Sequence, residues 1–417
     1  MRFLVIGSGG REHAIVRALS LSSSVSEIHA APGSAGISKY AVCHEASAMD
    51  HSSIVSLVKQ HRLDVVVIGP EDPLCSGLAD TLRAEGIKTV GPSKEAAQLE
   101  GSKIFCKKFL KSAGAPTARY EVVESLAETM AASASFEAPF VFKVDGLAAG
   151  KGVYICQNES ELEAAAKEVF EAKRFGAAGS KALLEEHLPG DEISYFVLTN
   201  GESYQALPLA RDHKRLMDKD RGPNTGGMGA IAPFQLSASL QQTIDTKVVA
   251  PFIAQLKSQN LDYRGVIYFG FMVHDDVPNV LEINVRFGDP EAQVLLPLID
   301  VDWGVLFSDL AEGRLSEFST KPLCTACVVL AAEGYPEAPK KGVPIDGDLL
   351  AETSSSYFLH AGTKKSEQVW QTNGGRVLNS IGVGSTHQEA IQRAYAQSES
   401  ANWLGRQMRR DIGSSVL

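Results

Sequence analysis

A strictly alternating segment in the second half of the chain carries three polar side chains that could bind a metal and a phosphate. Residues 281–287 alternate apolar and polar types, which in a strand places Glu282, Asn284 and Arg286 on one face. A carboxylate and an amide oxygen suit Mg²⁺, which takes few protein ligands and completes its shell with water and nucleotide phosphates. The guanidinium could neutralise charge that develops on an acyl or phosphoryl oxygen. Alternation is also typical of a half-buried strand with a solvated polar face, so the surrounding motifs must decide.

A lysine inside an apolar run and the glycine-rich turn after it form a second candidate site. Lys143 lies within the apolar run 140–144, where its ammonium is costly to bury unless an anion meets it. The turn 145–152 reads DGLAAGKG, and its backbone N–H groups could cradle phosphates. It is not a Walker A loop, because one residue between the glycines is missing and Gly152 stands where Ser or Thr would bind the metal. The alternative is a flexible hairpin with a snorkelling lysine.

Two further polar stretches fit the same chemistry. The extended run 183–188 ends in a turn with Glu192 beyond it, so the backbone could bond an adenine edge and Glu192 could take ribose hydroxyls. A solvated acidic turn is the alternative. Residues 211–229 are predicted to form a long polar loop, and such loops inside compact domains are usually functional. Its charges of both signs suit a zwitterionic substrate beside a phosphate, whereas a solvated mobile loop is the alternative.

The segment 7–12 (GSGGRE) follows the first apolar run and opens a predicted helix, much as a dinucleotide-binding fingerprint does. Glu12 replaces the third glycine of that fingerprint, and no clean acidic strand end follows about 20 residues later. A helix N-terminus with Arg11 beside it is still a good monophosphate site. A small phosphorylated substrate is therefore favoured over a nicotinamide cofactor.

The elements that position these groups predict an α/β protein of three domains. At 417 residues the chain exceeds what one hydrophobic core usually serves. Residues 1–101 alternate short apolar runs with helical stretches, the βαβ rhythm of an open parallel sheet. Residues 102–318 are predicted as an α+β domain with a lid subdomain at about 115–190. Residues 319–417 start the pattern again and form a small C-terminal α+β domain.

Composition excludes several classes of protein. A formal net charge of −10 argues against a protein whose main partner is a nucleic acid. The six cysteines are scattered, and the pair Cys324 and Cys327 lacks the further ligands of a zinc site, so a reduced, cytoplasmic setting is expected. Neither a signal-peptide apolar region nor a run of about 18 apolar residues is present, so no membrane association is expected.

Taken together, these stretches resemble the phosphoribosylamine–glycine ligase (glycinamide ribonucleotide synthetase) family of the ATP-grasp superfamily over nearly the whole chain. The resemblance implies an ATP-grasp fold: an N-terminal open parallel α/β sheet domain, a central ATP-grasp module with a lid, and a small C-terminal domain. The motifs that carry it lie at 7–13, 69–74, 98–103 (QLEGSK), 145–153 (DGLAAGKGV), 212–215 (DHKR), 222–230 (GPNTGGMGA), 286–291 (RFGDPE), 360–364 (HAGTK) and 372–378 (TNGGRVL).

This resemblance implies that glycine is joined to 5-phosphoribosylamine while ATP becomes ADP and phosphate, through a glycyl phosphate, in purine synthesis. It assigns Mg²⁺ or Mn²⁺ to Glu282 and Asn284, and catalysis to Arg286, Lys143 and Asp212. The residues it assigns to ATP are Lys103, Lys143, Gly150, Lys151, Gly152, Glu185, Glu186, Leu188 and Glu192. Those it assigns to the other substrates are Gly9, Gly10, Arg11, Glu12, Asp212, Gly226, Gly227, Arg286 and Gly288.

Water must be excluded from an acyl phosphate, so the lid is expected to close over ATP by flexing near Gly114 and Gly190. The substrates are small molecules, and a transient contact with the enzyme that supplies phosphoribosylamine is left open. Three rival functions are an ATP-grasp ligase for another acid or amine, a non-catalytic nucleotide sensor, and a dehydrogenase. The presence of Lys143, Glu282 and Arg286 disfavours the sensor.

Overall fold

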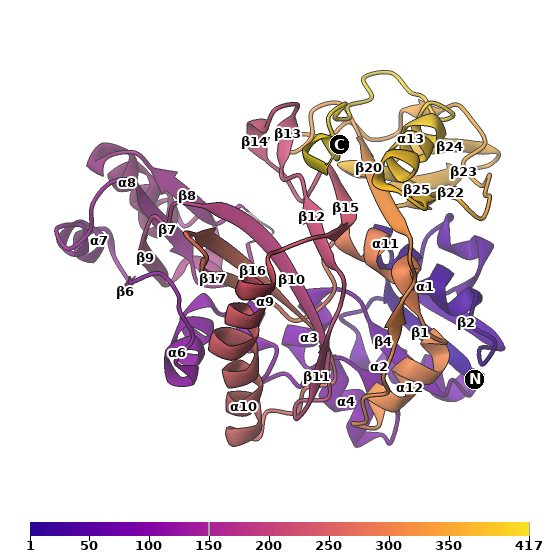
Figure 1. Ribbon diagram of the computed structural model, residues 1–417, viewed down its shortest axis with the longest axis horizontal. Helices are drawn as coiled ribbons and strands as arrows, with labels where there is room; N and C mark the ends of the chain where they lie inside the picture. The colour runs from indigo at the N-terminus through magenta and orange to yellow at the C-terminus, as the bar shows by residue number, and fades with distance from the viewer. Residues whose placement is uncertain (149–150, 417) are drawn as a thin grey trace.

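The computed structural model describes residues 1–148 and 151–416 and arranges them around one long antiparallel sheet. A smaller sheet with its own helices stands apart at one end of the molecule, and the C-terminal segment, coloured yellow, lies toward the other end (Figure 1). A parallel sheet formed by the N-terminal residues completes the body of the molecule. In the described part of the chain, no helix is long and apolar enough to cross a membrane.

The N-terminal sheet is parallel, as the βαβ rhythm predicts, with the strand order β3-β2-β1-β4-β5. Its strands are β1 (Arg2–Gly7), β2 (Glu27–Pro32), β3 (Val42–Cys43), β4 (Val65–Ile68) and β5 (Lys88–Val90). Strand β1 lies between β2 and β4, so the winding of the sheet reverses at this point. The turns after β1 and β4 therefore meet at the crevice where open α/β sheets bind ligands.

Local capping explains where several helices begin and end. In α2 (His51–His61), the Asp50 side chain accepts from the Ser53 N–H. In α6 (Lys103–Ala113), the Ser102 hydroxyl accepts from the Phe105 N–H, and the helix ends at Gly114, whose φ of 68° suits a residue without Cβ. Helix α6 thus has Ser102 as its cap at one end and Gly114 at the other.

The separate sheet at one end is the predicted lid region, with the strand order β6-β9-β7-β8. Its elements are β6 (Tyr120–Val123), β7 (Phe140–Val144), β8 (Val153–Cys156) and β9 (Ala182–Glu186), with the helices α7 (Leu126–Ser133) and α8 (Glu159–Ala166). Phe142, Leu162 and Leu184 belong to a hydrophobic cluster confined to this region. The lid region therefore has a core of its own.

The long sheet spans the middle and the C-terminal parts of the chain in the order β17-β16-β10-β12-β15-β20-β25-β22. Its strands are β10 (Asp191–Thr199), β12 (Leu209–Asp212), β15 (Gly229–Phe234), β16 (Gly265–His274), β17 (Val277–Asn284), β20 (Cys324–Ala331), β22 (Ser356–His360) and β25 (Arg376–Gly384), and β11 (Tyr204–Ala206) pairs with β10. In the C-terminal part of the chain, α13 (His387–Ser398) packs on β20.

The prediction of a long loop over 211–229 was wrong. The stretch contains the end of β12, a hairpin of β13 (Arg215–Met217) and β14 (Arg221–Asn224), and the start of β15. Strands β12 and β15 pair with each other, so tertiary hydrogen bonding overrides a composition that is polar and rich in glycine. The hairpin turns at Lys219 and Asp220, which both have positive φ.

Strand β10 separates two hydrophobic cores because its side chains alternate between the faces of the sheet. Phe196 and Leu198 pack in the core that includes α1 (Gly10–Ser20), α11 (Glu291–Leu295) and α12 (Trp303–Ala311). Ile193 and Tyr195 pack in the other core, with α9 (Ala238–Ile244) and α10 (Ala250–Ser258). One face of the sheet therefore carries the candidate site, and its opposite face is a separate surface.

Candidate active site

The predicted metal pair lies at the end of β17. Ile283 is buried, whereas Glu282 and Asn284 face the other way, and the Asn284 amide nitrogen donates to Glu282 Oε1 at 3.4 Å. A β-bulge interrupts the predicted alternation at Leu281, so it holds only from Glu282 onward. Gly270 on β16 pairs with Glu282, and a Cβ there would lie 2.9 Å from the Glu282 Cγ. Glycine at this position therefore makes room for the carboxylate.

Nearby cations keep Glu282 ionised. Desolvation opposes its charge, but Lys214 and Lys143 outweigh that effect and hold the pKa of Glu282 below its ordinary value. An ionised carboxylate beside an amide oxygen is a donor set that fits Mg²⁺ or Mn²⁺. In residues 1–148 and 151–416, no group of three or more His, Cys, Asp or Glu side chains is placed to hold a metal. Cys324 and Cys327 therefore belong to no such group there.

Lys143 meets an anion, as its place in an apolar strand predicts, and that anion is Glu185. The Lys143 Nζ lies 2.9 Å from Glu185 Oε2, and the buried Lys107 Nζ lies 3.1 Å from the same oxygen. Burial opposes the charge on Glu185, but Lys143 and Lys107 together lower its pKa. Sequence reasoning missed Lys107. Helix α6 carries several lysines, and only its packing against β9 shows which one turns inward.

Lys103 lies at the start of α6, next to the glycine-rich turn. Its Nζ donates to the Gly146 carbonyl at 3.4 Å, and burial, with the nearby Lys143, lowers the pKa of Lys103. Within the turn, Lys151 is exposed and Gly152 is buried, with its carbonyl accepting from the Val144 N–H at 2.8 Å. Gly150, predicted to bind ATP, lies outside the described residues.

The predicted adenine and ribose contacts lie along the connection from β9 to β10. The Glu186 carboxylate accepts from the Arg119 N–H at 2.7 Å, and Leu188 lies in the connection itself. Glu192, at the start of β10, forms an ion pair with Lys214. The side chain of Glu185 points into the lysine cluster, and its backbone lies in β9 between β6 and β7. Residues 187 and 188 follow the end of β9 and are outside this ladder.

Asp212 is the last residue of β12 and lies on the same face of the sheet as Glu192. Ser194 pairs with Ala210, and each of the two acids lies two residues from one member of that pair, so all four side chains share a face. Burial raises the pKa of Asp212, although Lys214 opposes the rise. Burial and the Asp212 charge together raise the pKa of the neighbouring Glu291 to about 8. Glu291 was not predicted as a site residue. The sequence feature that could have pointed to Glu291 is its place as the last residue of the motif 286–291 (RFGDPE).

Arg286, which the sequence predicts to neutralise charge on an acyl or phosphoryl oxygen, is paired with two carboxylates. Its Nη2 lies 2.7 Å from Glu100 Oε1 and its Nε lies 3.2 Å from Glu71 Oε2. Glu71 begins α3 (Glu71–Ser76) and Glu100 belongs to α5 (Gln98–Gly101). Burial opposes the charge on Arg286, but the two carboxylates raise its pKa further above the ordinary value. An anionic substrate at Arg286 must therefore compete with Glu71 and Glu100.

The turn after β1 holds carboxylates where the sequence predicts a phosphate. Glu12 Oε2 accepts from the Gly9 N–H at 2.7 Å, and Glu12 Oε1 accepts from the Arg11 Nε at 2.6 Å. Asp289 Oδ2 accepts from the Arg11 N–H at 3.2 Å. Gly10 packs against Asn379 and Gln293, and a Cβ there would overlap both amides. The N–H groups of Gly9 and Arg11 and the Arg11 guanidinium, which were expected to hold a phosphate, are therefore already bonded within the protein.

Three further glycines assigned to substrates lie where segments from different parts of the chain meet. The Gly226 carbonyl accepts from Arg376 Nη1 at 2.5 Å, and this guanidinium also bonds the Asp289 carbonyl. Gly227 has a φ of +110°, and a Cβ there would lie 2.5 Å from a Pro290 side-chain atom. A Cβ at Gly288 would overlap the Glu291 carboxylate. These glycines allow close packing beside Glu291.

The structure thus links predicted residues of the lid, the long sheet and the N-terminal sheet, and Arg286 and Arg11 both contact Glu71 Oε2, at 3.2 and 3.7 Å. Lys143 shows this convergence, because it reaches from the lid to the Leu281 carbonyl, at 3.4 Å, directly before Glu282. The arrangement offers cations for a polyphosphate, oxygen donors for a divalent cation, and carboxylates for an amine.

Three family models match consecutive parts of the chain: the N domain of phosphoribosylglycinamide synthetase at residues 1–100, its ATP-grasp (A) domain at 101–292 and its C domain at 325–415. The phosphoribosylamine--glycine ligase of Agrobacterium fabrum is 41% identical to this chain, over 100% of this chain and 99% of its own length. That of Halalkalibacterium halodurans is 39% identical, over 100% of this chain and 97% of its own length.

Solved structures agree with these matches. A phosphoribosylamine--glycine ligase from Thermotoga maritima is 35% identical with a TM-score of 0.85, covering 99% of this chain and 100% of that one. The biotin carboxylase domain of Hydrogenobacter thermophilus 2-oxoglutarate carboxylase, solved with MgADP, has a TM-score of 0.75 over 98% of this chain and 91% of that one. At 19% identity, this second likeness concerns the fold alone.

Proposed function

The chain belongs to the phosphoribosylglycinamide synthetase family, and we infer from that premise that it joins glycine to 5-phosphoribosylamine. ATP is converted to ADP and phosphate, and the product is glycinamide ribonucleotide. The chain is therefore an ADP-forming carbon–nitrogen ligase of purine biosynthesis. Its substrates are small molecules, and the reaction passes through glycyl phosphate.

We assign ATP to the space between the lid and the long sheet. Lys103 and Lys143 are the cations for the phosphates, together with the turn that contains Lys151 and Gly152. The backbone from Glu185 to Leu188 takes the adenine, and Glu192 takes the ribose. The support for this assignment is the convergence of lid and sheet groups, since Lys143 already bonds the Leu281 carbonyl beside the metal pair.

We assign Mg²⁺ or Mn²⁺ to Glu282 and Asn284, whose oxygen donors fit such a cation. When bound, the cation offsets the charge of the transferring phosphoryl group. Lys143 adds a second positive charge and orients the phosphates for in-line attack by the glycine carboxylate. Closure of the lid over this site would exclude water from the acyl phosphate that results.

We place glycine near Asp212, Gly226, Gly227 and Gly288. Its ammonium group suits Asp212, whose raised pKa is lowered again when a cation binds. Arg286 takes the carboxylate or the acyl phosphate once Glu71 and Glu100 give way. Phosphoribosylamine is assigned to the crevice lined by residues 9–12, where its phosphate has to take over donors that Glu12 and Asp289 occupy in this structure.

Three domains, at 1–101, 102–318 and 319–417, are proposed as the units that build this site. A cytoplasmic setting is also proposed, because all six cysteines are free thiols. A transient contact with the enzyme that supplies phosphoribosylamine is a further proposal, and chemical lability of the amine is the reason for it.

The observation that carries the proposal is the hydrogen bond from Lys143 of the lid to the Leu281 carbonyl, directly before the Glu282–Asn284 pair. The test measures orthophosphate release from ATP with Mg²⁺, with glycine and phosphoribosylamine present separately and together, for the wild type and Glu282→Ala. Release that needs both substrates and disappears in the variant supports the ligase. Release with another acid or amine in place of these two would redirect the assignment to a different ATP-grasp ligase.

A further inference from the structure

A pocket lies on the face of the long sheet that points away from the candidate active site. It has a volume of about 450 Å³, within the range of small-molecule sites. Its floor is apolar and is formed by Ile193, Leu236, Leu240 and Val273. Glu192 also borders it, but the Glu192 carboxylate is paired with Lys214.

Side chains alternate between the two faces of the sheet along β10 and β12, and this alternation separates the pocket from the candidate active site. On β10, Ser194 contacts Tyr268 and Glu291 on the active-site face, whereas Ile193 belongs to the opposite core. On β12, Asp212 faces the active site, and Arg211, one residue earlier, points into the pocket. The same two strands therefore present candidate active-site residues on one face and the lining of this pocket on the other.

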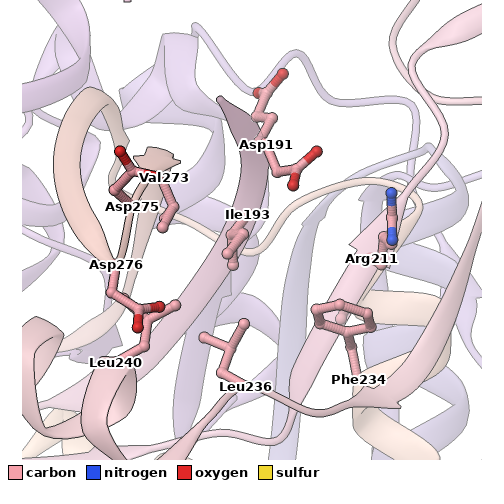
Figure 2. Close-up of a pocket in the computed structure, with 11 residues that line it drawn as sticks. Asp191, Ile193, Arg211, Phe234, Leu236, Leu240, Val273, Asp275 and Asp276 are labelled. Carbon is pink, nitrogen blue, oxygen red and sulfur yellow. The ribbon is translucent and has the colours of Figure 1, made fainter. Parts of the chain in front are cut away.

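Charges of opposite sign stand at opposite sides of the pocket. Figure 2 shows Asp275 and Asp276 on one side and Arg211 with Phe234 on the other, with Ile193 and the leucines between them. The Arg211 guanidinium lies 5.4 Å from the centroid of the Phe234 ring. Among the described residues, no ion-pair partner is found for Arg211 or for Asp276.

The two acids lie in a turn with a defined backbone conformation. Asp275 and Asp276 are the central residues of the turn between β16 and β17, and both have positive φ, 49° and 58°. This geometry is that of a tight two-residue hairpin turn, which keeps both carboxylates at the rim. Asp275 Oδ2 lies 3.6 Å from the exposed His274 ring, and Asp191 adds a third carboxylate to the lining.

We propose that this rear pocket binds a zwitterionic small molecule with an apolar middle, its ammonium group toward Asp275 and Asp276 and its anionic group toward Arg211. The floor supplies the apolar contact, and each rim supplies a charge that the protein leaves unmatched. A neutral apolar molecule would leave both charges solvated, and a simple anion would face three carboxylates.

The test compares four probes of one length by calorimetric titration: 6-aminohexanoate, hexylamine, hexanoate and hexanol. The zwitterion is expected to bind most tightly. Replacing both rim acids, in Asp275→Asn with Asp276→Asn, is expected to weaken its binding roughly fivefold, because two exposed charge contacts are lost. The matched control removes two exposed acids elsewhere, Asp300→Asn with Asp346→Asn, and is expected to leave binding unchanged.

Two results would overturn the proposal. One is equal binding of 6-aminohexanoate and hexanol, which would mean that the rim charges play no part. The other is unchanged binding in Leu236→Trp, a variant intended to fill the pocket from its half-buried floor. Thermal unfolding of each variant checks that it is folded, and the double rim variant removes only exposed side chains.

Discussion

The Nζ atom of Lys143 lies 2.9 Å from Oε2 of Glu185, and Lys107 shares that same oxygen at 3.1 Å. One buried carboxylate therefore holds two buried ammonium groups, one of which is assigned to ATP. Removing the charge in Glu185→Gln leaves both ammonium groups uncompensated, and breaking a buried ion pair in this way costs about 3 kcal/mol. We expect lower stability, and we expect a KM for ATP raised at least about tenfold because Lys143 is no longer held in place. A tenfold change corresponds to a loss of about 1.4 kcal/mol in binding free energy.

Urea unfolding and ATP titrations of phosphate release measure these two effects. Glu121→Gln is the matched control, since Glu121 is an exposed carboxylate on β6, the strand next to Glu185. Glu185→Gln with wild-type stability and wild-type KM would show that the cluster does not position Lys143.

Substitution of the metal pair should raise the Mg²⁺ concentration that the enzyme needs. In Glu282→Gln and in Asn284→Ala one oxygen donor is weakened or lost, and we expect turnover to fall about 10²-fold at limiting Mg²⁺. Phosphate release measured against Mg²⁺ concentration checks this. Asn279→Ala, on the same strand β17, is the control, and an equal loss in that variant would indicate damage to the strand instead.

Acid should remove a contribution that Glu352 makes to stability. Although burial opposes its charge, Lys39, Tyr40 and Arg17 lower the pKa of Glu352 to about 2. Because the folded-state pKa lies below the ordinary 4.5, the contribution is complete above about pH 4.5 and is lost as the pH falls toward 2.

Glu352→Gln is therefore expected to unfold more easily than the wild type at pH 7, by about 1 kcal/mol, because the group is partly exposed and solvent screens it. The difference should shrink below pH 4.5. Denaturant unfolding between pH 7 and pH 3 measures it, with the exposed Glu317→Gln as control. A difference that grew on acidification would contradict the assignment.

A methyl group at position 288 should damage the site by overlap alone. Gly288 is not in the left-handed region, but a Cβ there would overlap the Glu291 carboxylate. We expect Gly288→Ala to lose about 1–3 kcal/mol of stability and to raise the KM for glycine. Gly342→Ala is the comparison, since that glycine has open space around it and a φ of +80°, so it reports backbone strain without overlap.

Local patterns predicted the strands well, because a side-chain period of two is a property of neighbouring residues. The apolar run 140–144 is strand β7, and the alternation at Glu282 to Asn284 holds. The bulge at Leu281 could not be foreseen, since it depends on the partner strand β16.

Charge pairing was the part that the sequence could not predict. Arg286 meets Glu71 and Glu100, which lie 215 and 186 residues away along the chain. Glu12, which was expected beside a phosphate, accepts a hydrogen bond from the Gly9 N–H, a contact that the sequence did not indicate. The ion-pair partners of Arg286 depend on how elements far apart in the sequence pack together, so residue spacing within one segment cannot predict them.

Strand β15 has one feature that matters during synthesis. It pairs with β20, with Gly229 opposite Val328. Its neighbour in the sheet is therefore a strand from the last quarter of the chain. Until β20 has left the ribosome, the β15 edge presents unpaired N–H and C=O groups to other nascent chains. Translation at about 5–20 residues per second makes that wait several seconds long. A chaperone that shields this edge would raise the yield of folded protein most strongly when translation is slow.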